Sequence, residues 1–178
     1  PQSRQGVESI LRDVYQAARE YGDDWKKYNA LPAREKERTI PPRRDLNLEA
    51  TLDIITNKML IHCHSYVYTE ILMLMRLAEE FGFKVQNFTH VTEGYKVADE
   101  MAKHGATASS IVDWWAYKFE VYDAIPHNPA MMNERGIITS INSDSPELGR
   151  RLAHEAAKSI MYGGMSELDA IKMVTINP

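Results

Sequence analysis

The sequence has little cysteine, no long apolar run and no excess of positive charge, and each of these absences limits the functions to be expected. Cys63 is its single cysteine, so no intrachain disulfide can form, and cysteine usage leaves the redox compartment open. No apolar run approaches the roughly 18 residues that a membrane-spanning helix needs, so no membrane partner is expected. The chain has no excess of positive charge either, with 21 Lys and Arg against 25 Asp and Glu and a net charge of -4. Nucleic acid is therefore not expected as a partner.

The sequence also shows no signal peptide, and it opens at Pro1 rather than at a methionine. A segment that came before Pro1 could have been lost, so the localisation is left unknown. No linker or low-complexity stretch divides the chain, and we expect residues 1–178 to form one domain. Within it, residues 1–57 are expected to be mainly helical, with helices at 6–21 and 47–55 joined by a polar connection.

From residue 58 onward, short apolar runs alternate with amphipathic stretches, which predicts four βα units over 58–178. The expected strands are 58–64, 85–91, 107–113 and 137–143, and the expected helices are 68–82, 94–104, 122–135, 147–162 and one that opens at Ser166. This order implies parallel strands joined by right-handed crossovers, and hence an α/β fold. Four such units are half of a (β/α)8 barrel (TIM barrel), which typically takes about 250 residues.

Three polar groups each close one of the apolar runs. His62 follows the first run, His90 comes 28 residues later, and Asp144 comes another 54 residues later. These intervals are close to one and two βα units, which need about 30 residues each. Groups at the carboxyl ends of barrel strands converge on one face. Two imidazoles and a carboxylate there are the ligand types of a hydrolytic metal centre, and the carboxylate can also act as the catalytic base.

Alternatives to this interpretation stay open at several positions. His62 and His64 lie two apart in a strand and share a face, so either could be the ligand. Asp144 or Ser145 could simply cap the helix that follows. Trp115 lies in the aromatic run after the third strand, where a substrate loop is expected, but that run could equally pack on the barrel rim.

Five short motifs together resemble the amidohydrolase superfamily, and most closely its imidazolonepropionase-like branch, which includes exported bacterial enzymes. The motifs are Ile61-His62-Cys63-His64-Ser65, Thr89-His90-Val91-Thr92-Glu93-Gly94-Tyr95-Lys96-Val97-Ala98-Asp99, Asp113-Trp114-Trp115-Ala116-Tyr117-Lys118-Phe119-Glu120, Asn142-Ser143-Asp144-Ser145-Pro146-Glu147 and Val174-Thr175-Ile176-Asn177-Pro178.

The resemblance implies a (β/α)8 barrel of which this chain covers about strands 5–8 with their helices. It implies that His62 and His90 bind a divalent metal, with zinc the expected ion and one or two ions in the complete parent. Asp144 would bind metal and serve as the general base, and His64 and Trp115 would face a small-molecule substrate. The strand-one His-x-His pair, the strand-four ligand and the small β-sandwich domain of the family are absent from this sequence.

The function expected is therefore that of part of a metal-dependent amidohydrolase. A metal-activated water would hydrolyse a C–N bond in a cyclic amide, a small amide or a dipeptide-like substrate. One alternative is a catalytically silent half-barrel or interaction module that assembles with a partner or with itself. Another is a phosphate-binding isomerase or an aldolase, but the sequence has no Gly-rich phosphate loop near the last strands and no lysine that ends a strand.

A half-barrel is also expected to associate through its open face. Four strands would leave two open edges, and apolar strand residues that point inward would lose their packing partners. Ile61, Phe88, Ile111 and Ile141 are the candidates for such residues. We therefore expect a homo-oligomer rather than a stable monomer, and weak metal binding by this chain alone.

Overall fold

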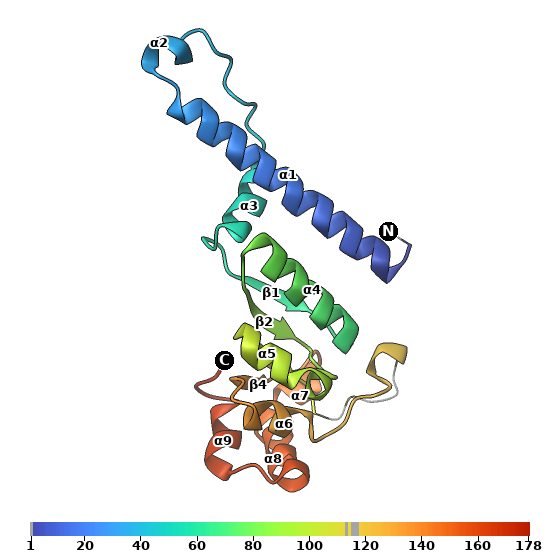
Figure 1. Cartoon of the computed structure of the whole chain (residues 1–178). Coiled ribbons are helices and arrows are strands. Elements are labelled where there is room, and N and C mark those ends of the chain that lie inside the picture. Colours follow the sequence, from blue (N-terminus) through green and yellow to red (C-terminus); the bar gives the residue numbers. More distant parts are fainter. Residues whose placement is uncertain (1, 113, 115–117) are drawn as a thin grey trace. The chain divides into compact units, whose positions relative to one another are not determined.

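The computed structural model describes residues 2–112, 114 and 118–178. Its contacts divide the chain into two compact units. One comprises Pro1–Leu60 with Leu77–Phe83, and the other comprises Ile61–Arg76 with Lys84–Pro178. Figure 1 shows the order of the elements along the chain. In the part of the chain that is described, no helix is long and apolar enough to cross a membrane.

The first unit is helical. Its elements are α1 (Arg4–Ala30), α2 (Ala33–Lys36), α3 (Leu46–Ile55) and the last residues of α4 (Tyr68–Phe81). Helix α1 begins where the Ser3 hydroxyl accepts a hydrogen bond from the Gly6 amide at 3.0 Å, which satisfies one of the free amides of the first turn.

Helix α1 extends well beyond the stop expected at residues 22–24. Gly22 lies within it, and a Cβ atom there would approach Leu52 Cδ1 of α3 to 2.7 Å. The glycine therefore allows the two helices to approach closely instead of ending the first one. Helices α1 and α3 lie side by side in Figure 1. The aromatic side chain of Tyr15 on α1 packs against Phe81 and Phe83, with ring centroids 5.4 and 5.0 Å apart.

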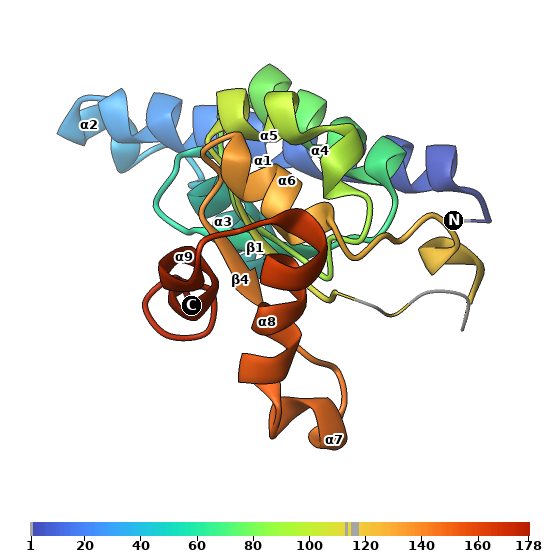
Figure 2. The ribbon, with the colours of Figure 1, turned by 90° about the horizontal axis from the view of Figure 1, so that it is seen from below.

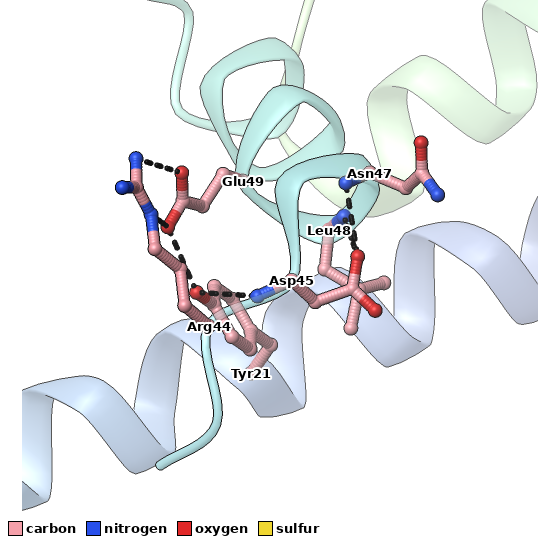
Figure 3. Close-up of polar contacts among 6 residues, drawn as sticks. All are labelled: Tyr21, Arg44, Asp45, Asn47, Leu48 and Glu49. Atoms are coloured by element: carbon pink, nitrogen blue, oxygen red, sulfur yellow. Dashed lines mark hydrogen bonds and ion pairs between the residues drawn. The ribbon is translucent and has the colours of Figure 1, made fainter. Parts of the chain in front are cut away.

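A polar cluster holds the start of α3, as Figure 3 shows. The Asp45 carboxylate accepts hydrogen bonds from the amides of Asn47 and Leu48 at 2.9 and 3.1 Å, so Asp45 is the N-cap of this helix. Arg44 donates two hydrogen bonds to Glu49, at 2.8 and 3.0 Å, and thereby lowers the pKa of that carboxyl group. The Tyr21 hydroxyl on α1 also donates to Glu49, at 3.2 Å.

The second unit is built on a parallel sheet. The described residues form four strands in the order β1-β2-β3-β4, namely β1 (Ile61–His64), β2 (Val85–Thr89), β3 (Thr107–Ser110) and β4 (Thr139–Ile141). All three strand pairs are parallel, and the register shifts between Ile61 and His62 in the first pair. This confirms an α/β fold with a parallel four-stranded sheet, which is consistent with part of a (β/α)8 barrel.

The connections are broken into more pieces than expected. After α4 come η1 (Gly94–Lys96), α5 (Ala98–His104), η2 (Phe119–Val121), α6 (Asn128–Glu134), α7 (Pro146–Gly149), α8 (Leu152–Gly163) and α9 (Glu167–Lys172). The expected helix 94–104 is divided at Val97, and the expected helix 147–162 at Arg151, where φ takes the non-helical values of -134° and -127°. Helix α6 starts later than expected because Pro129 occupies its first turn.

The two faces of the sheet differ in chemistry. One face is apolar, and its Phe88 and Ile141 side chains are buried. Figure 2 shows α5 and α6 along one side of the strands. The opposite face carries polar side chains in register across the strands, with His64, Thr89, Ser109 and Ser140 in one row. Phe88 and Ile141 therefore have packing partners within this unit, and the expected association stays a prediction.

The last two helices close the end of this unit beside β4. Helices α8 and α9 lie next to each other in Figures 1 and 2. They share a buried cluster with neighbouring elements, made of Val112, Ala130, Ile141, Ala156, Met165, Ala170 and Met173. The Ile141 amide donates to the Met173 carbonyl at 3.0 Å, and the Asn177 side chain donates to the Thr139 carbonyl at 2.7 Å. The outer edge of β4 is thus partly covered by the chain that follows it.

Candidate functional site

The candidate site lies at the carboxyl ends of β1, β2 and β4. The loops that leave these strands begin at Ser65, His90 and Asn142. Parallel strands present their carboxyl ends at the same edge of a sheet, so these loops are neighbours. The sheet register thereby brings together side chains that lie far apart in the sequence, such as His90 and Asn142, which are 52 residues apart.

Two histidines meet at this edge. The rings of His64 and His90 are 4.7 Å apart between centroids and lie nearly edge to face, at 75°. Tyr66 contacts both rings, at 4.8 Å from His64 and in a stacked arrangement 5.9 Å from His90. Tyr66 is buried, whereas His64 is exposed on the polar face. These three side chains form the aromatic centre of the site.

His90 has an unusual backbone conformation. Its φ of +62° lies in the left-handed region, which non-glycine residues seldom adopt. The residue that follows is held at both its backbone groups. The Val91 amide donates to the Ser109 carbonyl at 3.1 Å, and the Val91 carbonyl accepts from Ser110 Oγ and from Asn128 Nδ2, both at 2.7 Å. This clamp fixes the direction in which the His90 side chain leaves the strand.

The His90 ring is tied to the end of β4. His90 Nδ1 lies 3.0 Å from Asn142 Oδ1, within hydrogen-bond distance. Asn142 Nδ2 in turn donates to the hydroxyl of Ser109 on β3. Polar side chains that follow or belong to three neighbouring strands are therefore connected in one chain of hydrogen bonds.

The environment favours the neutral form of His90. Burial lowers the pKa of the His90 imidazole, and the nearby His64 and Lys118 charges lower it further. The hydrogen bond to Asn142 Oδ1 and the charge of Asp144 act in the opposite direction and raise it. Because the net shift is downward, His90 is uncharged at neutral pH and can offer a nitrogen lone pair.

Asp144 lies in the loop between β4 and α7, and its charge reaches the His90 imidazole. Its side chain is exposed. The cap of α7 is the neighbouring Ser145, whose hydroxyl accepts from the Glu147 amide at 3.2 Å and the Leu148 amide at 3.5 Å. The capping role that the sequence left open thus falls to Ser145.

His62 faces the same side of the sheet as His64 but lies further from the carboxyl ends. It lines a groove of about 480 Å³ on the polar face, together with Asn87, Thr107 and Ser140 among others. The Thr107 hydroxyl donates to Asn87 Oδ1 at 2.8 Å, and Asn87 Nδ2 donates to Thr89 at 3.1 Å. The histidine in ring contact with His90 is therefore His64, and the ligand role of either residue stays a prediction.

Trp115, the other residue predicted to contact substrate, lies outside the described residues. A residue of the same motif, Lys118, does reach the site. Its Nζ lies 3.8 Å from the centroid of the Tyr66 ring, in a cation–π contact. Lys118 of the motif after β3 thus contacts Tyr66 at the site.

Within the described residues, no complete metal site is formed. In the ranges 2–112, 114 and 118–178, no three His, Cys, Asp or Glu side chains gather in a way that could hold a metal ion. His64 and His90 are adjacent, but a stable zinc site needs three or four protein ligands. The residues described therefore do not fit a self-contained metal centre, and the predicted metal roles of His62, His90 and Asp144 stay predictions.

Sequence reasoning missed several residues that shape the site. Asn142 and Ser109 orient the His90 ring, and Tyr66 packs against it. Asn128 links three segments, since it donates to Val91 and Ser110 and accepts from the Tyr95 amide at 2.8 Å. The sequence offered one signal for Asn142: it lies two residues before the predicted site residue Asp144, in the same motif.

One of three comparisons with known proteins found a similar structure. No protein-family model matches the sequence, and no curated protein matches it significantly. Among solved structures, an amidohydrolase from Thermotoga maritima MSB8 matches with a TM-score of 0.82 and 27% sequence identity. The match covers 100% of this chain and 45% of that one, so the chain spans less than half the length of the structure it resembles. The fold of this chain is therefore similar to that of part of that amidohydrolase.

Proposed function

We propose that this chain supplies part of the active site of an amidohydrolase that hydrolyses a C–N bond in a cyclic amide, a small amide or a dipeptide-like substrate. The observation that carries the proposal is the contact of two imidazoles, His64 and His90, near Asp144 at the carboxyl edge of a parallel sheet. The likeness to the amidohydrolase from Thermotoga maritima MSB8 supports the same reaction class.

The finer form of the proposal places the chain in the imidazolonepropionase-like branch, as strands five to eight of the barrel. It includes a divalent ion, with zinc the expected ion, whose ligand set would be completed from outside this chain. Asp144 would accept the proton of the attacking water, and His64 and Trp115 would contact the substrate. The exposed side chain of Asp144 is open to solvent, from which an attacking water could come.

The reaction is tested with the full-length protein and a panel of cyclic amides, small amides and dipeptides, by following release of the amine. Asp144→Asn should lower kcat by about 100-fold or more, the usual effect of losing a general base. Asp99→Asn is the matched control, because Asp99 is an exposed carboxylate on α5 that pairs with Arg135. Full turnover by Asp144→Asn, or no hydrolysis anywhere in the panel, would refute the proposal.

The two strand histidines are separated by measuring bound metal beside turnover. His62→Ala and His90→Ala should lower metal content and turnover together, whereas His64→Ala should keep the metal and impair turnover or substrate affinity. The ring contact between His64 and His90 makes the reverse result informative. Metal loss from His64→Ala, with His62→Ala harmless, would exchange the two roles.

A second candidate is a catalytically silent module that assembles with a partner or with itself. The open groove of about 480 Å³ on the polar face favours it, because a face of this kind could receive another polar surface. Sedimentation equilibrium on the 178-residue chain should then show a dimer or a larger assembly. A monomer at all concentrations would remove this candidate and the expected homo-oligomer together.

A further inference from the structure

We propose that Asn142, held by Ser109, is a positioning residue that keeps the proton of neutral His90 on Nδ1 and presents Nε2 as a lone pair at the carboxyl edge of the sheet. The use of that lone pair in catalysis rests on the proposed function. The proton position itself does not, since it depends only on hydrogen bonds within this chain.

The first step of the argument is the direction of the Asn142 amide. Its Nδ2 group donates to the Ser109 hydroxyl, so the opposite atom, Oδ1, faces His90. An amide oxygen accepts hydrogen bonds and cannot donate them. The group that lies 3.0 Å away, His90 Nδ1, must therefore carry the hydrogen.

The second step concerns the other ring nitrogen. A neutral imidazole carries one proton, and when Nδ1 holds it, Nε2 is left as an acceptor. At about pH 8, well above the usual imidazole pKa of about 6.5, the ring is neutral. In histidines that bind a metal or transfer a proton, the hydrogen bond at one ring nitrogen decides whether the other nitrogen is a donor or a lone-pair acceptor.

The third step is the rigidity of the arrangement. His90 leaves β2 in the left-handed region, with Val91 clamped by β3 and by Asn128, so the ring cannot easily turn away from Asn142. The backbone N–H of Asn142 donates to the Ser110 carbonyl at 2.9 Å, which fixes Asn142, the partner of His90, against β3. Both ends of the hydrogen bond are thus attached to the same central strand.

The proton position is measured by long-range ¹⁵N–¹H correlation spectra of protein labelled with ¹⁵N-histidine, at about pH 8, well above the usual imidazole pKa. The His90 signals are identified by their loss in His90→Asn. We expect the protein to show the Nδ1–H tautomer. An Nε2–H tautomer would mean that the Asn142 amide is turned over, and it would overturn the proposal.

Variants test the role of each partner. Asn142→Leu, which cannot accept, should move His90 to the Nε2–H form that free imidazole prefers, whereas Asn142→Asp, which still accepts, should keep Nδ1–H. Ser109→Ala should give a mixture, because the amide loses the group that orients it. Ser140→Ala is the matched control, since its hydroxyl contacts the Ala108 carbonyl and not Asn142.

An unchanged tautomer in Asn142→Leu would overturn the role of Asn142, and an unchanged tautomer in Ser109→Ala would overturn that of Ser109. The spectrum of the unmodified protein decides the central point even where a variant fails to fold. Loss of the proposed function is seen separately, because a protein that hydrolyses no amide could still hold the proton on Nδ1.

Discussion

The two faces of the sheet differ in what they do: one packs the core of the second unit, and the other lines a polar groove. On one face Phe88 and Ile141 are buried, and they supply the packing that holds the second unit together. On the other face the same strands present histidine, threonine, serine and asparagine side chains that bond to one another and line a groove. Alternation of side chains along each strand is what separates the two roles.

This difference changes what an open sheet face is expected to do. An apolar face would demand cover, since each large apolar side chain gains about 1.5–3 kcal/mol on burial. A polar face can be wetted at little cost. Association through the groove face would therefore have to rest on hydrogen bonds and shape, and the proposed oligomer should be weak.

The largest effect is expected from the apolar face. Phe88 is fully buried, so Phe88→Ala should lower the free energy of unfolding by about 3–5 kcal/mol through lost burial and a cavity. Urea unfolding followed by circular dichroism measures it. A loss below about 1 kcal/mol would show that this face is not the core of the second unit.

A smaller effect is expected from the clamp at the carboxyl edge. Asn128 is fully buried and hydrogen-bonded to Val91, Ser110 and Tyr95. Asn128→Ala should cost about 2–3 kcal/mol in unfolding free energy, because it leaves buried polar partners unsatisfied. Hydrogen exchange at the Tyr95 amide should accelerate in parallel. Unchanged exchange at that amide would contradict the clamp.

The alternation of strands and helices could be predicted because local patterns and glycine stops determine it. The full length of α1 could not be predicted. Gly22 looks like a helix stop in the sequence, but in the fold it makes room for Leu52 of α3. The convergence of His90 with the end of β4 was predictable from βα spacing. The contact of His64 with His90 was not, because it depends on a register shift in β1 that no sequence pattern records.

The same substitution on the two faces should sharpen the comparison further. Thr139→Val, on the buried side, removes a hydrogen bond from its hydroxyl to the Ile137 carbonyl and should cost about 1 kcal/mol. Thr89→Val, on the groove side, removes the acceptor of the Asn87 side chain, but water in the open groove can replace it, so the free energy of unfolding should change by no more than about 0.5 kcal/mol. Equal costs would break the distinction between the faces.

The smallest effect concerns pH. The pKa of His90 is lowered in the folded protein, so the unfolded chain binds more protons as pH falls. The stability of the protein relative to His90→Asn should be full above the usual imidazole value of about 6.5 and decline below it. Asn tolerates the left-handed backbone, which makes it a fair reference. A relative stability that rises at low pH would mean that folding raises the pKa of His90, contrary to the prediction.

The central proposal is that this carboxyl edge forms part of a metal-dependent hydrolytic site, with further ligands supplied from outside this chain. Metal analysis of the full-length protein beside the 178-residue chain tests it most directly. The full-length protein should hold one or two divalent ions, lose them in His90→Ala, and bind them far more tightly than the chain alone. A metal-free full-length protein, or equal tight binding by the isolated chain, would contradict the account.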